Sequence, residues 1–475
     1  MDKEVKSAPF VGDAEGKPEE RTPRVRELLA FAFPSLPHAF VIMPLNIVIP
    51  TFYAAHTSVT LAQIAVLTSF TRIFDAILDP LTGYLSDRTR SPLGRRKPWV
   101  LAGGLLCSVA IFFLFQPPSS ANFAYYGFWS FAVYFGFTLF EIPRSAWSVE
   151  ISRDYNQRSR ISTYSAGFSV AGSLVFWVMP LLLFQMTGTT EITGTSLSAI
   201  AFLYATLMPL GIGIAIIAVR NGVKASEGNP TIGSLIRALR DNKPLWIYAA
   251  AIALWGLAQG AYMSTLLIFL SDYMKLGSIF PFLMVMFFFI QIGSMPIWYR
   301  IMSRIGKHRA WAIGVVIEIM LRPAILLFEP GSSAMVPMFL LGAVSAFLNT
   351  PANIAPGAAL GDIVDYGQMK TGVNNAGNFF ALNTLMIKAT MASGTGLAFG
   401  LLGFAGYSVG KPNGDVANFG LITCYLILPA ILNLCSAALI WRFPLTARRH
   451  STIRRRIERR AAIPFASPDI DPPVA

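Results

Sequence analysis

Residues 72–87 read RIFDAILDPLTGYLSD and lie inside an apolar segment that is long enough to cross a membrane. Arg72, Asp75 and Asp79 are spaced i, i+3 and i+7, so they share one face of the predicted helix. Charges in such a segment are costly unless they face a protein interior or a water-filled cavity. Because a cation-coupled transporter needs this kind of charged face inside the membrane, we take it as the first candidate functional site.

The composition places the chain in a broad class. It has 475 residues, of which 54% are hydrophobic and 13% are charged. A soluble domain contains about 25% charged residues, so these values indicate an integral membrane protein. The formal net charge of +13 comes from basic residues between the apolar segments. We interpret it as an orientation signal in the membrane and not as a nucleic-acid surface.

The cysteines and histidines predict no cofactor. Cys107, Cys424 and Cys435 lie in apolar segments without paired spacing. The four histidines form no metal-ligand pattern. We therefore expect no metal apart from a coupling ion, which would be H⁺ or Na⁺.

Apolar segments of spanning length predict an all-α membrane protein with twelve transmembrane helices. The segments lie near residues 28–52, 61–87, 98–117, 122–144, 161–186, 197–219, 245–271, 279–299, 310–328, 335–358, 377–406 and 418–442. The tenth is the weakest, because Pro351 and Pro356 interrupt it. These segments divide the chain into two tails, two six-helix bundles and a linker with a short amphipathic helix. The predicted boundaries are 1–27 for the N-terminal tail, 28–219 and 245–442 for the bundles, 220–244 for the linker and 443–475 for the basic C-terminal tail.

The distribution of basic residues predicts the orientation. Nearly all of the 38 Lys and Arg residues lie in the tails or in loops on one side of the predicted bundles. The loops on the opposite side contain Lys275 and Lys411 alone. By the positive-inside rule, both termini are expected in the cytoplasm.

The two predicted bundles repeat each other. Gly94-Arg-Arg-Lys after the second segment matches Gly306-Lys-His-Arg after the eighth, and the same spacing separates Glu150 from Asp362. Six plus six helices with recurring loop signals are typical of a parallel repeat, as in the major facilitator architecture. The sequence therefore predicts that fold.

Several motifs resemble one family within that superfamily. They are DAILDP at 75–80, GRRKPW at 94–99, EIP at 141–143 and GDIVDY at 361–366. Together they resemble the glycoside–pentoside–hexuronide:cation symporters, the family of the melibiose permease. The resemblance extends over roughly residues 28 to 442.

The resemblance implies roles for individual residues. The carboxylates matching Asp75 and Asp79 bind the coupling cation in that family, and the position of Thr138 contributes to its sodium site. Arg72 and Lys388 match basic residues that face the solute and cation cavity. These five residues are retained, so the resemblance implies a preserved coupling site.

Other positions depart from the family pattern. Leu78 replaces the sodium-site asparagine, Ala39 replaces a sugar-binding aspartate, and Ser145 replaces the tryptophan that stacks on sugar. Glu141 replaces a second sugar-binding aspartate, and the family's arginine of the fifth span falls near Ala166. Proton coupling is therefore at least as plausible as sodium coupling, and the departures argue against a galactoside as solute.

The charges inside the spans can be read in two ways. Arg72, Asp75, Asp79, Glu141 and Lys388 carry a net charge of −1, which one monovalent cation would neutralise. A bound cation would also relieve the repulsion between carboxylates one helical turn apart. The alternative is a static network, in which Arg72 and Lys388 are structural counter-ions. Substrate binding or proton transfer is the expected role of Glu141.

Three further sets of residues complete the prediction. Glu318 and Arg322 are expected to pair with each other at i and i+4. We expect cavity-lining positions at Ser145, Trp147, Tyr164 and Asn383. Charges at the predicted cytoplasmic helix ends are expected to gate the cavity through ion pairs between the bundles, which form when the cavity faces outward and break when it faces inward. The alternative is simple topogenic charge. They are Asp87, Arg95, Arg96, Glu150, Arg158, Asp362 and Asp365.

The favoured function is cation-coupled symport of a small polar solute, such as a sugar, glycoside or uronate, by alternating access. The alternative is an exporter or carrier of an amphiphilic, lipid-like compound with the same fold. No HExxH, Gly-x-Ser-x-Gly or Cys/His cluster supports an enzyme, and the tails are too short for a sensor domain. We expect a monomeric multi-pass protein of the cell (inner) membrane, whose partners are the solute and the bilayer and not nucleic acid.

Overall fold

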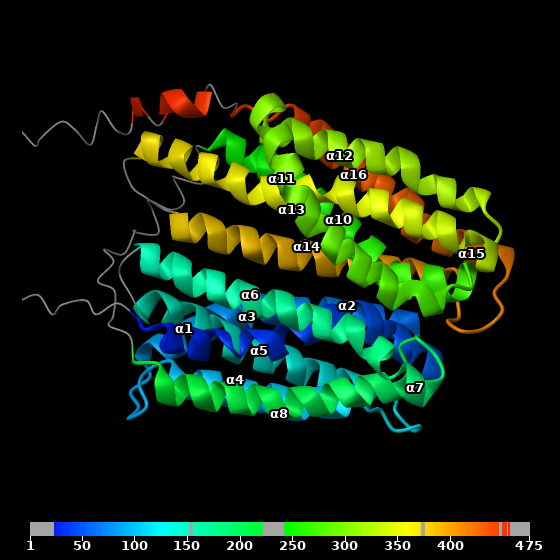
Figure 1. Ribbon diagram of the computed structural model, residues 1–475, viewed down its shortest axis with the longest axis horizontal. Coiled ribbons are helices and arrows are strands. Elements are labelled where there is room, and N and C mark those ends of the chain that lie inside the picture. The colour runs from blue at the N-terminus through cyan, green and yellow to red at the C-terminus, as the bar shows by residue number, and fades with distance from the viewer. Residues whose placement is uncertain are drawn as a thin grey trace, which may run out of the picture.

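The computed structural model describes residues 23–151, 155–221, 242–371, 376–445, 449–453 and 455–456. In these residues the regular elements are helices, which form two groups that run side by side along the long axis (Figure 1). The expected all-α architecture is therefore confirmed. Most of the predicted tails and linker lie outside the described residues.

The first group of helices, here the N-terminal half, extends to residue 221. Its elements are α1 Val25–Ala32, α2 Ser35–His56, α3 Leu61–Arg88, α4 Lys97–Leu114, α5 Phe123–Ile151, α6 Tyr155–Leu182, α7 Phe184–Thr187 and α8 Gly194–Ala218. Side-chain caps define two of the starts. Thr60 and Gln63 form a capping box at α3, and Thr193 and Ser196 form one at α8.

The second group, here the C-terminal half, begins at residue 242. Its α-helices are α10 Lys243–Ile268, α11 Phe280–Ile305, α12 Lys307–Leu321, α13 Met335–Thr371, α14 Ala376–Phe404, α15 Asp415–Ile422 and α16 Leu428–Trp441. Two π-helical turns interrupt it, at Phe269–Tyr273 after α10 and at Thr423–Ile427 between α15 and α16. Three short 3₁₀ turns lie at Gly277–Ile279, Arg322–Leu327 and Ser332–Ala334.

Helix α13 passes through Pro351 and Pro356 without a break and is 37 residues long. A proline inside a helix leaves the carbonyl four residues earlier without its backbone donor. For Pro351 that carbonyl belongs to Phe347, and the indole Nε1 of Trp298 donates to it at 2.7 Å. The neighbouring helix α11 therefore satisfies the group that the proline frees, as membrane helices commonly do.

Ten helical segments in the described part of the chain are long and apolar enough to cross a membrane. Helices α3 and α5 are not among them, although they have 28 and 29 residues. Helix α3 carries Arg72, Asp75 and Asp79, and α5 carries Glu141 and Arg144. The candidate charges of the N-terminal half thus lie on these two helices.

The two halves meet at one end of the molecule, where α7 and α15 lie, which we call the distal end (Figure 1). There the ring of Trp177 on α6 packs against Phe280 on α11, with centroids 5.4 Å apart. Gly403 of α14 lies against Ala62 of α3 so closely that a Cβ on the glycine would be 2.9 Å from the Ala62 Cβ.

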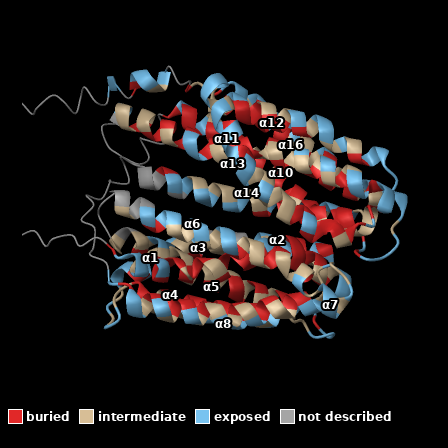
Figure 2. Ribbon diagram, viewed as in Figure 1, coloured by how far each residue is buried: buried red, intermediate tan, exposed pale blue. Residues whose placement is uncertain are grey.

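The hydrophobic cores show the same arrangement. One core joins residues of both halves, and its C-terminal members come from the distal parts of their helices, including Phe269 and Phe280. A second core, around Tyr248 and Trp311, contains residues of the C-terminal half alone. Figure 2 shows buried residues concentrated where the halves meet at the distal end. We call the opposite end, with Asp87–Lys97 and Gly306–Arg309, the basic end.

Candidate functional site

A cavity of about 510 Å³ lies between the two halves. Its N-terminal wall comes from α2, α3 and α5, and its C-terminal wall comes from α10, α11, α12, α13 and α14. The volume is within the range of about 300–1,000 Å³ that is typical of small-molecule sites. The cavity contains most of the charged residues that the sequence places inside the spans.

The N-terminal wall brings the predicted cation ligands together. Asp75 and Asp79 both line the cavity from α3. Thr138 of α5 is buried and donates from Oγ1 to Oδ1 of Asp79 at 2.9 Å. Leu78, on another face of α3, is 8% exposed and contributes no oxygen. Two carboxylates and one hydroxyl thus lie close together on this wall, and the side chain of Arg72 lies outside the described residues.

Glu141 and Lys388 connect the two walls. Nζ of Lys388 on α14 donates to Oε2 of Glu141 on α5 at 3.1 Å. Among the ion pairs between described residues, this is the one that joins the two halves. Both side chains keep more than two-fifths of their surface exposed. A polar solute in the cavity can therefore reach and compete for either partner.

The sequence interpretation missed His38 of α2. This side chain is 9% exposed and lines the cavity, with the rings of Phe137 and Phe140 centred 4.7 and 5.3 Å away. Its Nδ1 is buried and has no partner among the described residues. A histidine within an otherwise apolar segment was the signal for it.

The neutral residues of the C-terminal wall were also missed, although Lys388 of this wall was predicted. The wall presents amides and an aromatic ring and contains fewer charges than the N-terminal wall. The residues are Trp255, Gln259, Gln291, Asn349 and Asn353. Gln259 and Gln291 are polar residues within apolar runs, and that was the signal that could have identified them.

The four predicted cavity-lining positions are elsewhere. Trp147 is buried in the N-terminal half, where its Nε1 donates to the carbonyl of Arg220 at 3.0 Å. Asn383 accepts from the hydroxyl of Tyr248 at 2.8 Å within the C-terminal half. Tyr164 packs against the hydrophobic core, and Ser145 is exposed outside the cavity lining. These residues lie on other faces or further toward the basic end.

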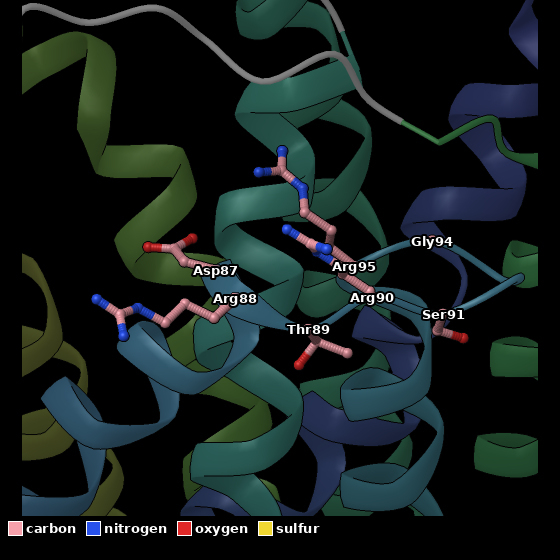
Figure 3. A pocket seen from close by; sticks show the side chains of 7 residues that line it. All are labelled: Asp87, Arg88, Thr89, Arg90, Ser91, Gly94 and Arg95. Atoms are coloured by element: carbon pink, nitrogen blue, oxygen red, sulfur yellow. The ribbon is translucent and has the colours of Figure 1, made fainter.

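The predicted gating charges of the N-terminal half form one cluster. Arg96 pairs with Asp87 and, at 2.9 Å, with Glu150, which Arg95 also approaches to 3.3 Å. Figure 3 shows Asp87 and Arg95 among the side chains around the α3–α4 turn. This turn lines a surface hollow of about 710 Å³, which is open and lies apart from the central cavity. The side chain of Arg158 lies outside the described residues.

The C-terminal half has an equivalent cluster. Nζ of Lys307 lies 2.7 Å from Oδ2 of Asp362, and Lys307 and Asp362 are the repeat counterparts of Arg95 and Glu150. His450 lies 2.7 Å from Asp365 and 3.4 Å from Asp362. Among the described residues, each of these pairs lies within one half. The halves meet at the distal end, and pairs between the halves are expected at the basic end only when the cavity faces outward.

Glu318 and Arg322 form the predicted pair on α12 and the turn that follows it. The guanidinium lies over the ring of Tyr262, 3.9 Å from its centre. Glu318 is 3% exposed and borders the cavity. Because both charges are buried and compensated, the pair contributes to packing of the C-terminal half.

Sequence comparison places the chain among sugar carriers. The family described as MFS/sugar transport protein matches residues 30–447. The glucuronide carrier protein homolog of Escherichia coli (strain K12) is 22% identical and aligns over 87% of this chain and 91% of its own. The inner membrane symporter YicJ of the same organism is 23% identical over 84% of this chain and 88% of its own. A lactose permease of Lactobacillus delbrueckii subsp. bulgaricus is 23% identical over 82% and 64%.

Solved structures agree on the fold. The nucleoside transporter NupG has a TM-score of 0.62 at 14% identity and covers 89% of this chain and 100% of its own. A bacterial homolog of the human lysosomal transporter Spinster has a TM-score of 0.56 at 13% identity, with coverage of 91% and 96%. At such low identity these matches show the fold alone.

Proposed function

The chain belongs to the MFS/sugar transport protein family, and we propose that it is a cation-coupled symporter of a small polar solute. The resemblance to the glycoside–pentoside–hexuronide symporters is confirmed by this match and by the relatives. The chain is a multi-pass membrane protein and a secondary transporter, not an enzyme. The coupling ion, the solute and the mechanism belong to the proposal.

The membrane topology is part of the proposal. We include α3 and α5 among the spans, which makes twelve, because each is long enough to cross and can turn its charges toward the cavity. The basic end would then lie in the cytoplasm, with both termini. The location proposed is the cell (inner) membrane, as the name of one relative says of that protein.

The observation that carries the coupling proposal is the contact between Asp79 and Thr138 inside the cavity. With Asp75 on the same helix, it offers oxygen ligands to a cation at the boundary between protein and solute. A cation that enters down the membrane potential gains about 2.3 kcal/mol per 100 mV, which can drive modest accumulation of a solute. Because Leu78 supplies no oxygen, H⁺ remains as good a candidate as Na⁺.

The arrangement of the halves supports alternating access. They are joined at the distal end, and the cavity lies on the side of this contact that faces the basic end. With the proposed topology this is a cytoplasm-facing state. The clusters around Glu150 and Asp362 would exchange their partners within each half for partners across the basic end when the cavity closes there.

Glu141 and Lys388 would link solute binding to this movement. Their pair connects α5 with α14, so a solute that inserts its polar groups between them would change how the halves are held together. Because the two side chains are largely exposed to the cavity, breaking their contact is not expected to cost much. This fits a pair that has to open in every transport cycle.

Gradient-driven uptake tests the proposal. Asp75→Asn and Asp79→Asn should each abolish accumulation of a solute taken up by the wild type, while the protein remains in the membrane at wild-type amounts. Asp415→Asn, at the exposed start of α15, is the control. Intact accumulation in both cavity variants would contradict the coupling role.

A carrier of amphiphilic compounds is the second candidate. It is favoured by apolar side chains in the cavity lining, among them Met43, Phe137 and Met263. Counterflow of an amphiphile, together with no gradient-driven uptake of polar solutes, would select it over the symporter.

A further inference from the structure

Gln259 is buried, lines the cavity and has no side-chain hydrogen bond among the described residues. It is 7% exposed, and its amide atoms are not among the polar atoms that are sealed from solvent without a partner, so they can be reached from the cavity. An unpaired amide that faces a cavity of about 510 Å³ therefore points to a ligand that completes its hydrogen bonds.

Close helix packing holds Gln259 in place. Gly256 and Gly260 flank it on α10 and allow α14 to approach closely. A Cβ on Gly260 would lie 1.8 Å from the carbonyl oxygen of Met391, and the hydroxyl of Thr395 donates to the Gly260 carbonyl at 3.1 Å. Gln259 and Lys388 are thus carried by one tightly packed pair of helices.

The neighbourhood of Gln259 suits a hydroxylated ring. Trp255 lies one helical turn earlier, is 8% exposed and also lines the cavity. Gln291 faces the same space from α11, likewise without a side-chain partner among the described residues, and Asn349 contributes an amide from α13. Each amide offers donors and an acceptor, as a hydroxyl group does. An indole face complements the apolar face of a sugar or polyol ring.

We propose that the amides of the C-terminal wall, with Gln259 and Gln291 foremost, recognise the hydroxyl groups of the solute and set its specificity. This rests on the proposed transport function and adds the residues that select its substrate class. The two walls have different roles because their side chains differ in charge. The N-terminal wall binds the cation with carboxylates, and the C-terminal wall binds the polyhydroxylated solute with neutral groups that need no change of protonation.

The test is equilibrium binding to the purified full-length protein without any ion gradient. The probes are glucose, galactose, lactose, glucuronate and sorbitol, followed by the 2-, 3-, 4- and 6-deoxy analogues of the best-bound monosaccharide. Gln259→Leu and Gln291→Leu are expected to weaken binding of the best probe about tenfold each, because a hydrogen-bonded site loses its partner. Gln116→Leu, two residues after the end of α4 and outside the cavity lining, is the matched control and should bind as the wild type does.

The deoxy analogues make the test specific. One analogue should bind the wild type about tenfold more weakly than its parent sugar. One of the two variants, Gln259→Leu or Gln291→Leu, should bind this analogue and the parent sugar with equal affinity. The reason is that the variant and the analogue remove the same hydrogen bond. If one variant fails to fold, the other applies the same test from a different helix.

Two results would overturn the inference. One is wild-type affinity for all probes in both variants. The other is a wild-type protein that binds none of these hydroxylated probes. Because binding is measured without a gradient, a failure of cation coupling would leave this result unchanged, and the two proposals can fail separately.

Discussion

The two walls of the central cavity differ in chemistry. The N-terminal wall collects carboxylates, with Asp75, Asp79 and Glu141 on two helices, whereas the C-terminal wall presents Gln259 and other amides. Carboxylates attract a cation, whereas neutral amides form hydrogen bonds with hydroxyl groups at any physiological pH. In the proposed function, the N-terminal half would couple to the ion and the C-terminal half would select the solute.

The largest effect on transport is expected when charge is removed from the N-terminal wall. Asp79→Asn keeps the size of the side chain but loses the charge, so accumulation against a gradient should fall about 100-fold, as expected when a charged ligand is lost. Counterflow of the same solute between equal ion concentrations should persist in proteoliposomes. Loss of both activities would show that Asp79 also binds the solute.

The pair that joins the walls should give a smaller effect. Lys388→Met leaves Glu141 without its partner at 3.1 Å, and uptake should fall about tenfold. The double variant Glu141→Gln with Lys388→Met should lose less than the two single variants combined, because the residues act as one unit. Uptake rates in cells, corrected for the amount of protein in the membrane, measure this. Additive losses would contradict coupling through the pair.

The hydroxyl of Thr138 distinguishes the two candidate ions. Thr138→Val removes the donor to Asp79 and one oxygen from the site. If Na⁺ couples, half-maximal uptake should need several-fold more sodium, because one ligand is lost. If H⁺ couples, uptake should stay independent of sodium. Suppose that uptake by the wild type depends on sodium and that Thr138→Val needs the same sodium concentration. This result would show that Thr138 is not a ligand of the site.

The C-terminal wall depends on tight packing of α10 against α14. Gly260→Ala would force the helices apart, because the new Cβ would lie 1.8 Å from a backbone oxygen. Overpacking of this kind costs about 1–3 kcal/mol of stability, so the protein should melt at a lower temperature and bind solute more weakly. Gly400→Ala on α14, where a Cβ would meet nothing within 4 Å, is the control. Equal melting temperatures for both variants would contradict this packing.

The smallest effects are expected at the basic end. Lys307→Gln leaves Asp362 close to His450, and Arg95→Gln leaves Glu150 paired with Arg96. Each single loss should therefore cost less than about 1 kcal/mol of stability, as for partly exposed ion pairs. Thermal unfolding of the two variants side by side measures this. A much larger loss in one half would show that the two clusters are not equivalent.

The sequence identified the carboxylates of the cavity for a physical reason. Charge inside an apolar segment is rare and costly, so Asp75 and Asp79 were conspicuous without any knowledge of the fold. Neutral amides carry a weaker signal, and Gln259 was missed because one amide in a long helix usually has a structural role. Its importance depends on facing an open cavity, which only the packing of α10 reveals.

Which helices a residue contacts was harder to predict than which residues are candidates for function. Trp147 and Asn383 were assigned to the cavity, but a linear sequence does not show which face of a helix meets which neighbour. The charges at the basic end were identified as a set, yet their partners depend on how far apart the halves are. Helix α13 also continues through Pro351, where Trp298, 49 residues before Phe347, supplies the missing hydrogen bond.

Solute-driven ion movement in proteoliposomes tests the division of labour most directly. With no gradient imposed, the best-bound sugar of the panel is added outside, and internal pH and sodium are followed. The wild type should admit one of the two ions with the solute, and Asp79→Asn should admit neither. Gln259→Leu should need about tenfold more solute but reach the same ion flux at saturation. Ion entry through Asp79→Asn, or none through Gln259→Leu at saturating solute, would contradict the account.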